Sequence, residues 1–279
     1  MRQHKPDTGG RLRNDDRAVS EVVAFVLVFA IILGSVGILY STGFQAMDDY
    51  QENEQLVNAE RAMDALADNF NDVIRYSGVN QRYGELSLRD GTITTSDSGT
   101  KLNITIDGVG GGEPIGTNGD GTFANYSDEA TVDLGEFTYT SDGEIIAYEG
   151  GGLVRVGESG WSDMRKQPQI TCAEDSDTAV ISLVAISSDA QTVQSSSGRG
   201  VTMAVENRSS KVYDEDDFND DDGDVTIAIE DGDTDYEDAW NSTLSTERDW
   251  ENGSNGNIER TCSDRERVVV TIVEVDIEF

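Results

Sequence analysis

Hydrophobic and polar residues divide the chain into three patterns, and the first is an uninterrupted apolar run. Residues 22–47 form 26 consecutive positions without a charged side chain. As a helix they would extend about 39 Å, more than the roughly 30 Å hydrocarbon core of a bilayer. The run exceeds the apolar core of a secretory signal, about 7–15 residues, and no small-residue cleavage site follows it. We therefore predict a transmembrane helix over residues 19–45.

The second pattern is an apolar stripe at helical spacing, with polar residues between its members. Neither glycine nor proline interrupts residues 44–77. The spacing predicts an amphipathic helix over residues 46–77 that continues the transmembrane helix, from about Val19 to a stop at Ser77-Gly78. The same pattern also fits a transmembrane helix followed by a short dimeric stalk. The stripe consists of Leu56, Ala59, Met63, Leu66, Phe70 and Val73.

The third pattern, after Gly78, consists of short apolar runs separated by turn-forming residues. Several runs alternate apolar and polar positions, as in KLNITI at 101–106, and Ser-Asp-Gly at 141–143 indicates a hairpin turn. The predicted strands are Glu85–Arg89, Lys101–Ile106, Ala130–Leu134, Phe137–Thr140, Glu144–Tyr148, Leu153–Val156, Thr178–Ile186, Val201–Glu206, Asp224–Ile229 and Arg267–Phe279. A short helix is predicted over Tyr236–Ser245.

Together the three patterns predict an α+β protein. A long N-terminal helix, half transmembrane and half amphipathic, would pack on an antiparallel β-sheet or sandwich domain over residues 78–279. Residues 1–18 would form a cytoplasmic leader. The β domain would lie outside the cell, because the basic residues stand before the apolar run and the acidic residues after it.

The charges beside the apolar run set its predicted orientation. The leader carries Arg2, Lys5, Arg11, Arg13 and Arg17, whereas residues 45–60 carry five acidic residues and no lysine or arginine. Since basic flanks stay in the cytoplasm, the N-terminus is predicted inside and everything after about residue 45 outside. The chain is therefore expected to be a single-pass protein of the cell membrane.

The overall charge is strongly negative. Twenty Lys+Arg stand against 55 Asp+Glu, which gives a net charge of −35. A polyanion gains nothing from another polyanion, so no nucleic-acid partner is expected. At molar salt the Debye length falls to about 3 Å and self-repulsion is screened, which favours a protein from a salt-loving organism. An acidic disordered chain is the alternative, but the strand-like apolar runs argue against it.

Residues that carry chemistry are scarce, and no catalytic or cofactor-binding role is expected. The single histidine, His4, lies in the leader, so the β domain has none for a Ser-His-Asp, Cys-His or zinc site. The acidic run DEDDFNDDDGDV at 214–225 resembles a calcium loop. Phe218 occupies a ligand position there and no glutamate ends the loop, so an acidic solvated loop is favoured over a metal site.

Two covalent features are expected on the extracellular side. Cys172 and Cys262 are the two cysteines, and each precedes a predicted strand. A disulfide between them is favoured over free thiols and would pin neighbouring strand starts. Five Asn-x-Ser/Thr triplets are candidate glycosylation sites, although some arise by chance in a chain rich in serine and threonine. Their asparagines are Asn103, Asn125, Asn207, Asn241 and Asn252.

The junction Arg17-Ala18-Val19-Ser20-Glu21, followed by VVAFVLVFAIILGSVGILY, resembles the N-terminal segment of haloarchaeal type IV pilin-like proteins. The resemblance implies that a prepilin-type peptidase cuts between Ala18 and Val19. It also implies that the helix stays on the mature protein and packs against like or related pilin subunits. The resemblance is specific over about residues 13–45. Archaeal adhesion pilins usually carry proline where this chain has Glu21, and this difference counts against polymerisation.

The residues around this junction suit assembly. Cleavage would create an α-amino group at Val19, two residues from Glu21, as a cation for that carboxylate. Two small-xxx-small pairs, Ala30 with Gly34 and Gly37 with Ser41, permit close helix contact, although glycine is common in transmembrane helices in any case. The expected function is a structural or adhesive subunit, or a minor component, of a pilus-like surface filament. The alternative is a monomeric anchored ectodomain that binds extracellular or envelope ligands.

Overall fold

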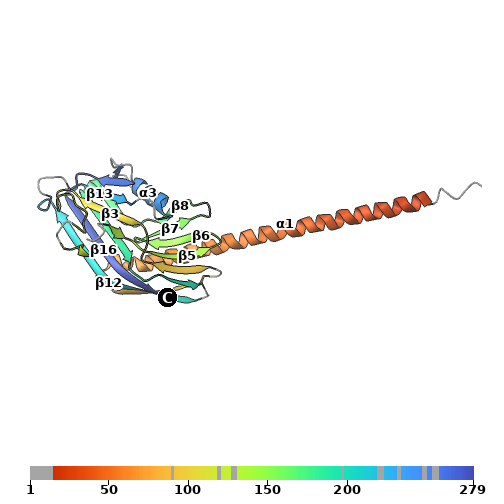
Figure 1. Ribbon diagram of the computed structural model, residues 1–279, viewed down its shortest axis with the longest axis horizontal. Helices are drawn as coiled ribbons and strands as arrows, with labels where there is room; N and C mark the ends of the chain where they lie inside the picture. Colours follow the sequence, from red (N-terminus) through yellow and green to blue (C-terminus); the bar gives the residue numbers. More distant parts are fainter. Residues whose placement is uncertain are drawn as a thin grey trace, which may run out of the picture. The chain divides into compact units, whose positions relative to one another are not determined.

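The computed structural model describes residues 15–88, 91–117, 121–126, 131–195, 198–218, 223–230, 234–246, 250–252 and 258–279. The chain divides into two compact units, Met1–Glu54 and Gln55–Phe279. The first unit contains the N-terminal part of helix α1 (Asp15–Phe70). The second contains the C-terminal part of α1 and the β domain (Figure 1). The α+β class is therefore confirmed.

Helix α1 ends earlier than predicted, at Phe70, and a single further turn follows as α2 (Asp72–Arg75). The helix is therefore interrupted at Asn71, where the side chain bonds the β domain, and helical backbone bonds continue beyond it to the amide of Tyr76. The Asn71 amide donates to the carbonyl of Gly151 at 2.8 Å, and its Oδ1 accepts from the hydroxyl of Tyr148 at 2.9 Å. A buried amide with both groups bonded fixes the chain direction at this point.

Within the described residues, sixteen strands form three sheets. Their bounds are β1 (Gln81–Leu86), β2 (Thr92–Ser96), β3 (Lys101–Ile106), β4 (Val132–Asp133), β5 (Glu136–Ser141), β6 (Glu144–Glu149), β7 (Gly152–Val156), β8 (Ser162–Lys166), β9 (Gln169–Ala173), β10 (Thr178–Ile186), β11 (Gln191–Gln194), β12 (Arg199–Asp214), β13 (Val225–Ile229), β14 (Glu251–Asn252), β15 (Glu259–Cys262) and β16 (Arg267–Glu278). The helical elements between them are α3 (Glu237–Thr246) and the 3-10 turns η1 (Ala124–Tyr126) and η2 (Glu174–Ser176).

The first sheet has the order β1-β12-β16-β10-β9, and its long strands β12 and β16 lie side by side in Figure 1. The second has the order β11-β2-β5-β6-β7-β8, and the third has the order β14-β15-β13-β3-β4. The predicted wholly antiparallel domain is wrong in one pair. Strands β10 and β16 are parallel, from Thr178 opposite Arg267 to Ile186 opposite Val275. Parallel strands are buried on both faces, and most of β10 is buried.

Several strands match the prediction closely, whereas the polar ones were missed. Strands β3 and β10 have the predicted bounds, and α3 lies at the predicted short helix. Strand β12 is ten residues longer than predicted, sixteen residues against six, and β1 begins four residues before the predicted Glu85. The prediction omitted β2, β8, β9, β11, β14 and β15. Arg89 and Ala130, at the ends of two predicted strands, lie outside the described residues.

Two apolar cores form on opposite faces of the long strands. The helix core contains the predicted α1 stripe together with β5, β6, β10, β12 and β16 residues such as Phe137 and Val273. The α3 core contains Trp240, the third sheet and other residues of β10 and β16. Side chains alternate along a strand, so one strand can serve both cores. In β10, Ala179, Ile181 and Leu183 face the α3 core, whereas Val184 and Ile186 face the helix core.

Candidate functional site

The apolar part of α1 is the first candidate site. Ser20–Phe44 is a 25-residue helical segment with no buried residue, and an 18-residue window within it has mean hydropathy 3.0, so it is long and apolar enough to cross a membrane. Large side chains along it are open, for example Phe25 at 70% and Leu39 at 71% exposure. The hydroxyl groups of Ser35 and Thr42 are bonded within the helix, where they donate to the carbonyls of Ile32 and Ile38 at 2.8 Å. Internal bonding of this kind suits a segment without water around it.

The predicted packing residues all lie on this segment. A Cβ added to Gly34 or Gly37 would meet no atom within 4 Å, so backbone is accessible at both positions. The Ser41 hydroxyl donates to the Ile38 carbonyl at 3.0 Å, so this short side chain is bonded to its own helix. Ala30 is exposed on the same helix. The four positions, spaced by four, three and four residues, lie on one face of the helix.

The predicted processing site lies at the start of α1. Ala18 and Val19 belong to the helix backbone, which begins at Asp15 instead of the predicted Val19, and Glu21 is exposed. Residues 1–14 of the predicted leader lie outside the described residues.

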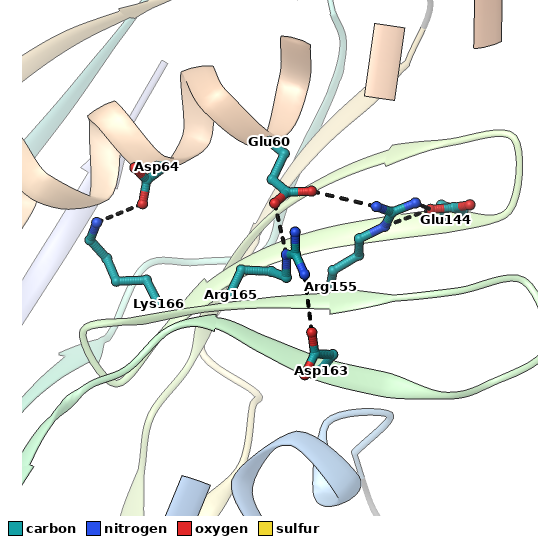
Figure 2. A network of polar contacts seen from close by, with 7 residues as sticks. All are labelled: Glu60, Asp64, Glu144, Arg155, Asp163, Arg165 and Lys166. Carbon is teal, nitrogen blue, oxygen red and sulfur yellow. Dashed lines mark hydrogen bonds and ion pairs between the residues drawn. The ribbon is translucent and has the colours of Figure 1, made fainter. Parts of the chain in front are cut away.

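The second candidate site is a junction of charged side chains where α1 crosses β7 and β8 (Figure 2). Glu60 on α1 accepts a hydrogen bond from Arg165 Nε at 2.7 Å and pairs with Arg155 Nη1 at 3.5 Å. Arg155 also donates twice to Glu144, at 2.9 and 2.7 Å, and Arg165 pairs with Asp163 at 3.2 Å. The carboxylate of Glu60 is about four-fifths buried, so it depends on both arginines.

A second node of the junction lies one turn further along α1. Lys166 Nζ pairs with Asp64 at 2.6 Å and with Asp68 at 3.2 Å. Glu60, Asp64 and Asp68 are spaced by four residues and face the same side of the helix. The junction positions α1 on the strands. Sequence reasoning missed it, because the i, i+4 acids resembled a solvated helix face and β8 was not predicted.

The predicted disulfide is confirmed, and it lies beside the strand starts that the prediction named. Cys172 and Cys262 are joined and buried. Cys172 lies within β9 of the first sheet, and Cys262 ends β15 of the third sheet. The bridge therefore ties two sheets together across the α3 core. It precedes β10 and β16, whose starts lie opposite each other at Thr178 and Arg267, as the prediction expected.

The sequon asparagines differ in accessibility. Asn125 is exposed in η1 and donates to Glu274 at 3.3 Å. Asn103, Asn207 and Asn241 are half-buried on β3, β12 and α3. Asn241 also accepts a hydrogen bond from Arg260 at 2.6 Å. The side chain of the fifth, at position 252, lies outside the described residues.

The acidic run at 214–225 begins with a turn that its own residues stabilise by hydrogen bonding. Asp214 N donates a hydrogen bond to Asp217 Oδ2 at 3.2 Å, which closes a turn between these two residues. Phe218, which occupies a ligand position in the calcium-loop register, is buried in the α3 core. Residues 219–222 lie outside the described part of the chain. Among the residues that are described, no group of three or more His, Cys, Asp or Glu could hold a metal ion.

These features define a class of protein: a disulfide-bridged, three-sheet β domain preceded by a helix that could span a membrane. The chain belongs to the Family of unknown function (DUF7289), whose model matches residues 17–278 and so takes in the apolar helix and the β domain together. No curated protein and no solved structure matches the chain.

Proposed function

We propose that this chain is a single-span, pilin-like surface protein that serves as a structural or adhesive subunit, or minor component, of an archaeal type IV pilus-like filament. The observation that carries the proposal is the fully exposed 25-residue apolar helix joined to a β domain. An apolar surface of this size in water is unfavourable, so lipid or other helices must cover it. The family match supports treating the helix and the β domain as one functional unit.

The proposed orientation places residues 1–18 in the cytoplasm and the β domain outside. The basic leader and the acidic stretch after residue 47 support it. The disulfide supports it independently, because such bonds persist in oxidising compartments and are rare in the cytosol.

Assembly in the proposal rests on the start of α1. A prepilin-type peptidase would cut between Ala18 and Val19, leaving a mature chain with 15 Lys+Arg, 52 Asp+Glu and no histidine. The new amine at Val19 would pair with the Glu21 carboxylate. Ala30, Gly34, Gly37 and Ser41 would form the contact strip for like or related pilin subunits, since backbone at both glycines is accessible.

The proposed setting is the surface of a halophilic cell. A mature charge of −37 is tolerable where molar salt screens repulsion. Among the four sequon asparagines whose side chains are described, Asn125 is the exposed one and is our candidate for glycosylation.

The deciding experiment is N-terminal sequencing of the native protein, with an expected start at Val-Ser-Glu. Replacing Arg17 and Ala18 together with glutamate should block processing and leave a slower-migrating, membrane-bound precursor. The matched control replaces Gly10 and Arg11 with glutamate, which makes the same charge change away from the junction and should leave cleavage intact. A native protein that keeps its leader would refute the pilin proposal.

The alternative proposal is a monomeric, membrane-anchored ectodomain that binds extracellular or envelope ligands. Glu21 favours it, because archaeal adhesion pilins usually carry proline there. The Gly34→Cys variant distinguishes assembly from the monomeric ectodomain. Disulfide-linked dimers of this variant in native membranes would support assembly, whereas a chain that does not crosslink would support the monomer. The exposed Leu39→Cys variant, off the small-residue strip, is the control for random collision.

A further inference from the structure

Helix α3 and the residues before it bring two aromatic donors against two carboxylates of the second sheet. The Tyr236 hydroxyl donates to Glu136 on β5, and Trp240 Nε1 donates to Glu149 at the end of β6. Glu149 is fully buried, with 0% exposure. The Trp240 ring lies against the β6–β7 turn, where a Cβ on Gly150 would be 3.0 Å from it. These contacts attach α3 to the domain.

Glu149 also bonds the residue that precedes β3. The hydroxyl of Thr100 donates to Glu149 Oε1 at 2.7 Å, and the Thr100 amide donates to Oε2 at 3.1 Å. Among the described residues, the hydrogen-bond partners of Glu149 are thus uncharged. The Thr100 hydroxyl lies 3.3 Å from the hydroxyl of Thr234, so it can donate there instead and accept a hydrogen bond from the protonated Glu149 carboxyl group. The site therefore accommodates both the charged and the neutral carboxyl group.

The charged and titratable groups around Glu149 are mostly acidic. Glu136 and Asp235 add negative charge near the cluster and Tyr236 adds a phenol. Near Thr100, Asp133 bonds the Gly99 amide at 3.1 Å and lies 3.9 Å from Lys101. Burial raises the pKa of Glu149 to about 7, although bonds from Trp240 and Thr100 oppose the shift. Burial raises the pKa of Glu136 as well.

We propose that the contact between Glu149 and Trp240 is a pH-sensitive clasp, which holds α3 on the β domain most firmly in acid and loosens as the pH approaches neutrality. The reason is that docked α3 keeps Glu149 away from water, whereas opening of α3 exposes it. A buried carboxyl group without a cation favours its neutral form, and water favours the ionised form.

The sign follows from linkage. The docked pKa of about 7 lies above the ordinary value of 4.5 for an exposed glutamate, so the extra stability of docking is complete below pH 4.5. The extra stability is lost as the pH rises from 4.5 to 7, because the open form ionises first. Above pH 7 both forms are ionised, and the stability of docking no longer changes with pH. Opening of α3 should therefore increase on the order of a hundredfold between pH 4.5 and 7.

Opening would expose part of the α3 core. Trp240 and Leu244 are fully buried, and the amide of Ala239 bonds Ser162 Oγ on β8 at 3.0 Å. Helix α3 lies beside β8 in Figure 1. The clasp is thus a regulator of apolar exposure on the β domain, and it does not depend on how the apolar helix is used.

The test is hydrogen–deuterium exchange of the full chain in detergent micelles from pH 4.5 to 8, corrected for intrinsic exchange rates. Protection of amides in Glu237–Thr246 should fall at least tenfold from pH 4.5 to 7 and level off above it. Glu149→Gln should lower protection, because an amide group would face the Thr100 donor, and should strongly reduce its pH dependence, leaving only a contribution from Glu136. Exposed Glu113→Gln is the matched control and should keep the wild-type profile.

Flat protection in the wild type, or an unchanged pH profile in Glu149→Gln, would overturn the clasp. A second readout serves if that variant fails to fold. The indole N–H resonance of Trp240, assigned by its loss in Trp240→Phe, should titrate in the wild type with a midpoint near pH 7. An indole resonance that does not move between pH 5 and 8 would equally overturn the proposal.

Discussion

Removing the Cys172–Cys262 bridge should strongly destabilise the β domain. The two cysteines are 90 residues apart, and closing a loop of that length lowers the entropy of the unfolded chain. The chain-entropy relation gives about 4.6 kcal/mol at 25 °C for this loop. Replacing both buried cysteines with alanine also removes two sulfur atoms from the α3 core, each worth on the order of 1 kcal/mol. The double variant should therefore lose about 5–7 kcal/mol of unfolding free energy.

The assay is urea unfolding of the full chain in detergent and high salt, followed by Trp fluorescence. Reduced wild type is the matched control, because it lacks the bond but keeps both sulfur atoms, and it should lose about 4.6 kcal/mol. The dependence of unfolding free energy on urea should steepen in both samples, since an unlinked unfolded chain exposes more surface. A loss below about 2 kcal/mol with an unchanged slope would show that the bridge does not act through the unfolded state.

Three further substitutions test the packing of the β domain by the same urea assay. Phe70→Ala should cost about 3–5 kcal/mol, because the ring is fully buried in the helix core; a cost under 1 kcal/mol would contradict that burial. Gly135→Ala should cost at least about 1 kcal/mol, since Gly135 has φ +56° and a Cβ there would overlap the carbonyl oxygen of Ile186; a neutral result would refute this close approach. A double-mutant cycle with Glu60→Gln and Arg165→Gln should give a coupling of about 1 kcal/mol that weakens in molar salt, and zero coupling at low salt would count against the junction.

The long strands show how a signal can be present in the sequence and still be misread. The run AVISLVAI in β10 is nearly continuously apolar, which is typical of a strand buried on both faces. Sequence reasoning located the strand correctly but assumed antiparallel pairing. The choice of β16 as a parallel neighbour depends on segments about 90 residues apart, and no local pattern encodes it.

Polar strands were missed because their stability comes from partners far along the chain. Strand β8 reads SDMRK, which has little apolar alternation. Its Arg165 and Lys166 are held by acids of α1, and its neighbours are β7 and α3. In the same way the interruption of the helix at Asn71 was missed, because that side chain bonds a turn 80 residues away.

The sequence by itself determined the apolar helix, the amphipathic stripe, the position of the main strands and the pairing of two cysteines, because periodicity, length and residue type encode these directly. Only the tertiary structure decided the sheet order, the parallel pair, the charged junction on α1 and the burial of Glu149. Each of these depends on residues that the chain brings together from distant segments, as Thr100, Glu149 and Trp240 are. A carboxyl group's environment is therefore set by the fold, and the same glutamate in an open loop would keep its ordinary pKa.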